Sequence, residues 1–220
     1  STAGPTGPYD VTYTYTDVNS CISSTVQQVL VDEFPIVSSG TGGSECDLDY
    51  TFSASTSVGT GSWTLVSGPG SAFFNNASSP TSSVQVTQYG TYVFQWEGVN
   101  GECSDSDQVT VNFYQQPTVT LQADRSECQL SYSLTSSTNI PVTGYSWSQV
   151  SGPTALIVGG TTATATIITP GTLGAYVFEL EVTVNGCTAT DQITITQVAA
   201  PVANAGSGGN ECDLNFGLTA

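Results

Sequence analysis

The chain has 220 residues, with 18 acidic side chains against a single basic one, so its net charge at pH 7 is −17. Such a surface is repelled by polyanions, so we expect no binding to nucleic acid or to anionic membranes. There is no Lys and no His, which excludes Lys–Asn isopeptide cross-links, His-based acid–base catalysis and His-ligated metal sites, and we expect no enzymatic activity.

One sequence module recurs along the chain with a period of about 80 residues, a length typical of a tandem array of one domain. Three times a cysteine is followed at one constant spacing by a proline, and that proline is followed at a second constant spacing by another cysteine. These triplets are Cys21/Pro35/Cys46, Cys103/Pro117/Cys128 and Cys187/Pro201/Cys212. The constant spacings fix the register of the repeat.

The phase of the repeat predicts four segments. Residues 1–35 match only the second half of a module, and residues 202–220 match only the beginning of one. Between them, 36–117 and 118–201 are complete modules, each near the lower end of the usual domain size. We therefore expect the C-terminal half of a preceding module, two complete modules and the start of a following module, all parts of a longer array.

Strands are predicted along the whole of each module. Leu48, Tyr50 and Phe52 alternate with polar residues, and this period of two is typical of half-buried strands. In the first complete module the predicted strands are 36–41, 47–54, 62–67, 71–75, 82–88, 91–98 and 107–114, and the second module repeats this order. The predicted fold class is all-β: tandem Ig-like antiparallel β-sandwiches that form a rod.

Two tryptophans are expected at the centres of the two cores. Trp63 and Trp147 each lie inside an alternating strand, and each precedes the next cysteine of the repeat by the same interval. Tyr92 and Tyr176 begin a later alternating strand in the two modules. Because large aromatic side chains in such strands are usually packed, we interpret these residues as core and not as a ligand platform.

Several polar and aromatic groups receive a structural interpretation. Carboxylate pairs such as Asp105/Asp107 are two residues apart on strand faces, so we interpret them as solvent-facing charge and not as the paired acids of a glycosidase. Phe73 and Phe74 are expected to lie in a strand packed on the core, and a sugar-binding edge is the alternative.

The cysteines indicate structural disulfides. Six cysteines follow the module period, and none forms a Cys-x-x-Cys pair. This pattern predicts an oxidising, extracellular setting. No apolar run approaches the roughly 20 residues that span a bilayer, so we expect no membrane insertion by this segment.

Two disulfide schemes compete. The simpler one joins Cys46 to Cys103 and Cys128 to Cys187, within each module. However, Cys103 is expected in a turn at the end of the sandwich where the chain enters, and Cys46 at the end where the chain leaves. The extended segment from Pro35 to Cys46, which connects these ends, spans about 36 Å, whereas bonded cysteines have Cα atoms within about 7 Å. This topology favours a bond between modules, Cys46–Cys187, and in that scheme the partners of Cys21, Cys103, Cys128 and Cys212 lie elsewhere.

Acidic residues near the module junction suggest a candidate calcium site. Glu45, Asp47 and Asp49 supply oxygen ligands, which calcium prefers. The second module has Gln129 where the first has Asp47, so the cluster is not repeated. We expect no other cofactor.

Four strings resemble a known family. They are GSWTLVSGP at 61–69, YSWSQVSGP at 145–153, YVFQW at 92–96 and VNGCTATD at 184–191. They resemble PKD-type Ig-like repeats, and with ANAG at 203–206 they are similar to repeats of giant cell-surface adhesins of gliding Bacteroidota. This resemblance implies PKD-like sandwiches in an exported protein displayed on the cell surface.

The expected function is that of a structural stalk segment of an extracellular bacterial adhesin or surface filament, which extends an adhesive tip and transmits force. Its expected partners are the neighbouring modules of the same chain, and also surface glycans or other adhesin chains. One alternative is a carbohydrate-binding or spacer module of a secreted glycan-degrading enzyme. Another is a self-polymerising filament subunit.

Overall fold

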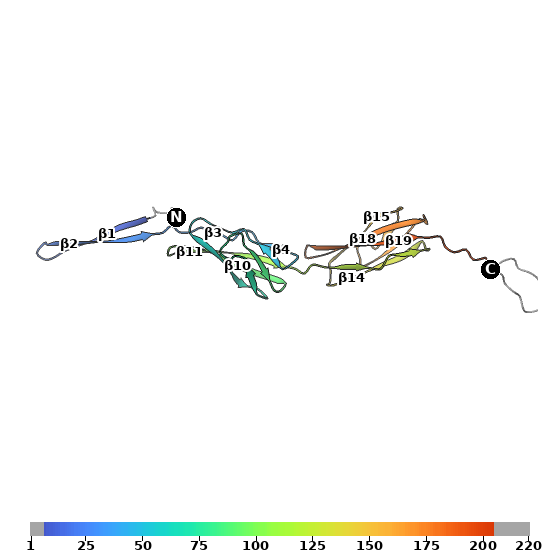
Figure 1. Ribbon diagram of the computed structural model, residues 1–220, viewed down its shortest axis with the longest axis horizontal. Coiled ribbons are helices and arrows are strands. Elements are labelled where there is room, and N and C mark those ends of the chain that lie inside the picture. Colours follow the sequence, from blue (N-terminus) through green and yellow to red (C-terminus); the bar gives the residue numbers. More distant parts are fainter. Residues whose placement is uncertain (1–6, 205–220) are drawn as a thin grey trace, which may run out of the picture. The chain divides into compact units, whose positions relative to one another are not determined.

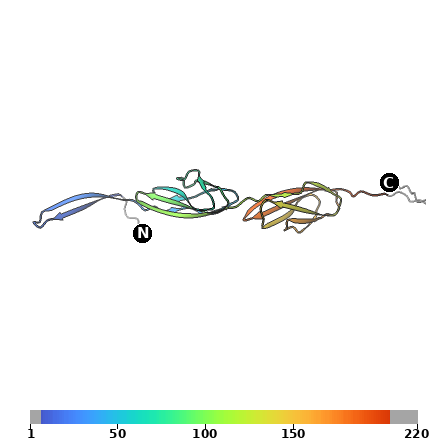
Figure 2. The same ribbon diagram turned by 90° about the horizontal axis from the view of Figure 1, so that it is seen from below.

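The computed structural model describes residues 7–204, in which every regular element is a β-strand (Figure 1, Figure 2). Within that range no helix has the length and hydropathy needed to cross a bilayer. The chain divides into two compact units between Gln115 and Gln116. The all-β fold class predicted from the alternating pattern is therefore confirmed.

The first unit begins with an isolated hairpin, β1 (Gly7–Thr16) and β2 (Ile22–Val31), which forms a two-stranded sheet of its own. Tyr9 lies opposite Val29, just as Tyr92 lies opposite Val111 in the last hairpin of the same unit. The two hairpins thus share their register. Among the described residues, however, no other strand pairs with β1 or β2, and Tyr13 is 65% exposed.

The rest of the first unit is a β-sandwich. One sheet has the order β4-β11-β10-β7, the other has the order β5-β9-β8, and β3 pairs with β6. The strands are β3 (Val37–Ser38), β4 (Gly43–Glu45), β5 (Asp49–Thr51), β6 (Ser55–Thr56), β7 (Thr60–Ser67), β8 (Ala72–Phe74), β9 (Ser83–Val86), β10 (Gly90–Asn100) and β11 (Cys103–Phe113).

Three predicted strands differ clearly from those observed. The strand expected at 47–54 is shortened to β5, and β6 follows it as a separate strand. The strand expected at 36–41 is divided into β3 and β4, which lie in different sheets, because the chain crosses from one sheet to the other near Ser39. The last strand is predicted at 107–114, but β11 starts at Cys103 because a two-residue turn continues the β10–β11 ladder to the Asn100/Cys103 pair.

The second unit repeats this arrangement. Its sheets have the orders β12-β14-β17-β16 and β13-β19-β18-β15. The strands are β12 (Val119–Leu121), β13 (Arg125–Glu127), β14 (Ser131–Thr138), β15 (Gly144–Ser151), β16 (Leu156–Val158), β17 (Thr164–Ile168), β18 (Gly174–Val184) and β19 (Cys187–Gln197). Each unit therefore contains an antiparallel two-sheet sandwich with one parallel pair, β4 with β11 or β13 with β19.

The inward-facing residues of the alternating strands fill both cores. Trp63 and Trp147 are 2% and 7% exposed, and Tyr92 and Tyr176 are fully buried. In the first core the rings of Phe52 and Trp63 are stacked, with their centroids 3.8 Å apart. The second core is mainly aliphatic, with Leu134, Ile167, Leu180, Val182, Ile193 and Ile195.

Each core also contains a tyrosine corner. The hydroxyl of Tyr92 donates a hydrogen bond to the carbonyl of Gln88 over 3.0 Å, and that of Tyr176 donates to the carbonyl of Thr172 over 2.9 Å. In both cases the acceptor lies four residues upstream, in the loop that leads into the strand. This bond closes the corner by which an Ig-like sandwich changes sheets.

We predict that Tyr92→Phe and Tyr176→Phe each lower the free energy of unfolding by about 1 kcal/mol, because each change removes the hydrogen bond that a buried tyrosine donates to the loop carbonyl. Urea unfolding measures the effect. Tyr89→Phe is the matched control, since Tyr89 is exposed. An equal loss of stability in all three variants would contradict a specific role for the corner.

Candidate functional site

The cysteines occupy two kinds of position in the sandwich. Cys46 follows directly after β4, and Cys187 is the first residue of β19, where it is buried. Both Cys46 and Cys187 are disulfide-bonded. Cys21, Cys103 and Cys128 are free thiols, and Cys212 lies outside the described residues.

The alternative scheme of bonds within each module is wrong, because Cys103 and Cys128 are free. The strand register gives the physical reason. Glu45, next to Cys46, pairs with Phe113 at the end of β11, whereas Cys103 is the first residue of that strand. The extended strand separates those ends by about 33 Å, far beyond the roughly 7 Å that a disulfide allows between Cα atoms.

A tight turn fixes the position of Cys187. Asn185 and Gly186 form the two-residue loop between β18 and β19, with φ angles of 51° and 87°. Asn-Gly is the favoured sequence for such a turn because both residues tolerate a positive φ. Val184 and Cys187 are consequently paired, and Cys187 lies at the tip of the hairpin.

A carboxylate holds the first strand of each module where it crosses between the sheets. The backbone N–H and the hydroxyl of Ser39 both donate to one oxygen of Asp107, over 2.9 and 2.8 Å. In the second unit the backbone N–H of Leu121 donates to Asp191 over 2.8 Å. In both modules the other carboxylate oxygen accepts the N–H of the next residue.

This crossing corrects one interpretation made from the sequence. Asp107 is not simply a solvent-facing charge, because it anchors the buried Ser39. The hydrogen bonds from Ser39 hold the pKa of Asp107 below its ordinary value, since they stabilise the charged form. Its equivalence to Asp191, one module later, was the available signal.

The candidate calcium site is also corrected. Within residues 7–204, no group of three or more His, Cys, Asp or Glu side chains is placed to hold a metal ion, so Glu45, Asp47 and Asp49 do not form such a site. Asp47 instead accepts the N–H of Asp49 over 2.9 Å, and Asp49 accepts the side-chain amide of Gln85 over 3.2 Å. These carboxylates serve local turn and strand contacts.

Arg125, the sole basic residue, makes its contacts within its own module. Arg125 forms an ion pair with Glu127 over 2.6 Å and donates to the carbonyl of Ser133 over 3.0 Å. Its guanidinium also lies 6.0 Å from the centre of the Tyr132 ring. Burial raises the pKa of Tyr132 to about 12, so this hydroxyl stays neutral at physiological pH. Arg125 therefore stabilises its own module.

The two phenylalanines of β8 lie on opposite faces of the strand. Phe74 packs against the first core, and Phe73 is 63% exposed on the opposite face of the strand. Core packing thus holds for one of them only. A single exposed ring is common on protein surfaces, so Phe73 by itself defines no sugar-binding edge.

One family model and several solved structures are similar to parts of this chain. Residues 117–197 match the family model described as K319L-like, PKD domain. No curated protein matches the sequence significantly. Among solved structures, the PKD domain of human KIAA0319 is 20% identical, with a TM-score of 0.35 over 42% of this chain and 89% of that one.

Two other solved structures are similar over more of the chain. An I-band fragment of titin is 14% identical, with a TM-score of 0.44 over 87% of this chain and 75% of that one. Fibronectin(III)-like modules of Clostridium thermocellum CbhA are 12% identical, with a TM-score of 0.37 over 79% of this chain and 100% of that one. None of these scores is high, so the fold assignment rests on the strand order itself.

We predict that Asp107→Asn lowers the free energy of unfolding of the first module by about 1–2 kcal/mol at neutral pH, because it removes the charge that accepts both donors of Ser39. The pKa of Asp107 is lowered in the folded state, so its stabilisation is complete above the ordinary value of 3.8 and is lost as the pH falls through the folded-state pKa. The difference between the two proteins should therefore shrink in acid.

Urea unfolding at several pH values, followed by tryptophan fluorescence, tests this prediction. Asp105→Asn is the matched control, because Asp105 accepts the N–H of its neighbour Ser106 instead of donors from the first strand. A difference between Asp107→Asn and the parent chain that stays constant into acid would contradict the assigned role of the carboxylate.

Proposed function

We propose that this chain is a structural segment of an extracellular array that carries mechanical load, in which a Cys46–Cys187 bond joins one module to the next. The observation that carries the proposal is the bonding state of the cysteines. Cys46 and Cys187 are bonded, whereas Cys103 and Cys128, their possible partners within each module, are free. A bond between neighbouring modules satisfies this pattern.

The strand order within each module suits mechanical load. The first strand of the larger sheet, β4, runs parallel to the last strand, β11, and β13 runs parallel to β19. Pulling on the two ends of a module slides these neighbours along one another, so several hydrogen bonds must break together. The backbone hydrogen bonds continue beyond the strands. The N–H of Tyr114 donates to the carbonyl of Glu45 over 2.8 Å, and the N–H of Val198 donates to the carbonyl of Glu127 over 2.9 Å.

The setting proposed for this segment is extracellular. Disulfides persist in oxidising compartments, and small exported domains use them to supplement a limited hydrophobic core. The PKD-type match over 117–197 supports the same setting. We further propose that the array is displayed at a bacterial cell surface as an adhesin stalk, with neighbouring modules as its first partners.

The disulfide pairing can be tested by cutting the chain between the modules. A specific protease site is inserted between Tyr114 and Pro117, and the folded protein is cleaved and separated without reductant. We expect the two halves to remain joined and to separate after reduction, because the bond links residues on either side of the cut.

Cys46→Ser is the control, and its halves should separate in either condition. Cys103→Ser should behave like the parent chain, since Cys103 is a free thiol. If the parent halves come apart without reductant, the proposed bond between modules is wrong.

A further inference from the structure

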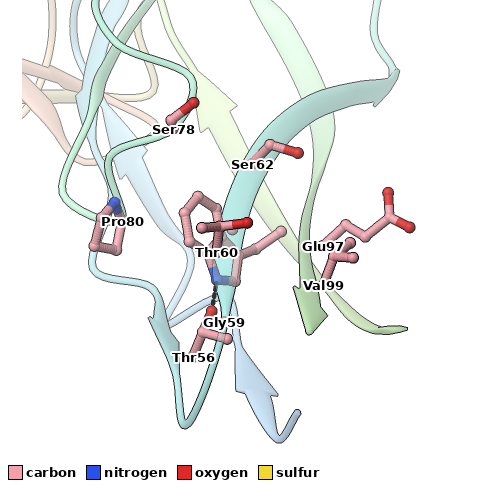
Figure 3. A pocket seen from close by; sticks show the side chains of 10 residues that line it. Thr56, Gly59, Thr60, Ser62, Ser78, Pro80, Glu97 and Val99 are labelled. Atoms are coloured by element: carbon pink, nitrogen blue, oxygen red, sulfur yellow. Dashed lines mark hydrogen bonds between the residues drawn. The ribbon is translucent and has the colours of Figure 1, made fainter. Parts of the chain in front are cut away.

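The β1–β2 hairpin presents a face that is core in a complete module. Because the two hairpins share their register, Tyr13 takes the position that Trp96 has in β10. Trp96 is 2% exposed, and its indole N–H donates to the hydroxyl of Thr56 over 2.7 Å, as the dashed line in Figure 3 marks. Tyr13, by contrast, is 65% exposed. Among the described residues the hairpin thus lacks the covering layer that a complete module has.

In the complete module, one continuous segment closes an edge of the β10–β11 hairpin and covers part of its apolar face. β4 pairs in parallel with the end of β11. After Cys46 the chain enters the other sheet, where the ring of Phe52 meets that of Phe94 edge-on, with the centroids 5.1 Å apart. Residues 43–52 therefore supply both contacts.

The sequence of this covering segment recurs near the other end of the chain. The string GNECDLNFGL at 209–218 corresponds to GSECDLDYTF at 43–52, with Cys212 in the place of Cys46. The apolar alternation is kept, since Leu218 takes the place of Phe52. Residues 205–220, here named the C-terminal segment, lie outside the described residues, so this correspondence comes from the sequence. It gives the C-terminal segment the pattern that covers a hairpin of this kind.

We propose that copies of this chain associate end to end, with the C-terminal segment of one copy covering the β1–β2 hairpin of the next. Residues 209–211 pair in parallel with residues 29–31 of β2, and Leu218 packs against Val11, which takes the position of Phe94. Two complete modules separate these segments within one chain, so the pairing is assigned to neighbouring copies. Because the two surfaces differ, the association continues beyond two copies.

The tip of the β10–β11 hairpin supplies independent support. The side-chain amide of Asn100 donates to the carbonyl of Glu33 over 2.8 Å, and the Sγ of Cys103 lies 3.9 Å from the carbonyl oxygen of Asp32. Cys103 therefore contacts the residue that directly follows β2. When residue 211 of another copy pairs with residue 31, Cys212 comes next to the same place. The proposed pairing thus brings Cys212 to the free thiol of Cys103.

A second pair of cysteines follows from the bond between modules, and this step rests on the proposed function. In that bond, the cysteine after the first strand of one module joins the cysteine at the hairpin tip of the next module. The same relation between two copies joins Cys128 to Cys21 of the next copy. Both are exposed free thiols.

Each of these bonds forms by thiol–disulfide exchange. Two protein thiols are oxidised to one disulfide, while one molecule of oxidised glutathione is reduced to two glutathione thiols. The C-terminal segment supplies equivalents of β4 and β5 alone, so the noncovalent contact is small. The two bonds make the association lasting.

The full chain, incubated in a buffer of oxidised and reduced glutathione, tests the proposal. The products are separated without reductant, and their bonds are mapped by mass spectrometry after proteolysis. We expect a ladder that continues beyond two copies, with Cys21–Cys128 and Cys103–Cys212 as its bonds. Leu218→Asp should slow the formation of the ladder at least about tenfold, because a charge replaces an apolar side chain that the association buries.

Thr219→Asp is the matched control, because it adds the same charge at a position equivalent to the exposed Ser53, and its rate should be unchanged. On the hairpin, Val11→Asp should act like Leu218→Asp. Its own control is Thr12→Asp, on the opposite face of β1. All four sites lie outside the two described cores, so both sandwiches stay folded.

A chain that stays monomeric in this buffer would overturn the proposal. Products that stop at two copies would also overturn it, since they would show hairpins pairing with each other. So would a ladder that forms equally fast in Leu218→Asp, since the thiols would then react without docking. The Cys46–Cys187 bond is measured separately on the cleaved chain, so a failure of the stalk proposal is distinguishable from a failure of this one.

Discussion

The carboxylates of Asp107 and Asp191 hold the point where the first strand of each module leaves one sheet for the other. This crossing is demanding, because β3 and β4 contain only two and three residues and cannot rely on long ladders of their own. A charged acceptor on the last strand supplies the bond that the crossing backbone lacks. Once it is held, the first strand can reach the edge of the larger sheet and pair with β11.

That parallel pairing has consequences for the ends of the module. It brings Glu45 beside Phe113, at the far end of β11 from the turn that contains Gly101. The cysteine after β4 and the cysteine at the hairpin tip therefore belong to opposite ends of one sandwich. The disulfide pattern thus depends on where the first strand crosses, and so on the carboxylate that holds it there.

The sequence predicted the class of fold and most of its strands, because alternation of polar and apolar residues reports directly on burial in a sheet. It also disfavoured bonds from Cys46 to Cys103 and from Cys128 to Cys187 within the modules, since the length of an extended strand gives the distance between its ends. It did not predict the role of Asp107, because a carboxylate on a strand face is usually solvated. Only the structure shows that the backbone of Ser39 lies opposite that carboxylate.

The different packing of the two cores could not be predicted either. Gly61 and Tyr145 occupy the same position of the repeat. The first module needs glycine there because the ring of Trp96 lies over it, whereas the second module has the smaller Leu180 in place of Trp96. The two cores satisfy the same backbone with different sets of volumes, one rich in aromatic rings and the other in branched aliphatic chains. A repeated backbone therefore does not imply a repeated core.

The hairpin β1–β2 has a further consequence for how this polypeptide behaves in solution. Tyr9, Val11, Tyr13 and Tyr15 line one face of a two-stranded sheet, and all four are exposed. Exposed apolar faces and unpaired strand edges favour self-association, and the high negative charge opposes it. Apolar attraction between chains and repulsion between their charges are thus in balance, and added salt can tip this balance toward self-association.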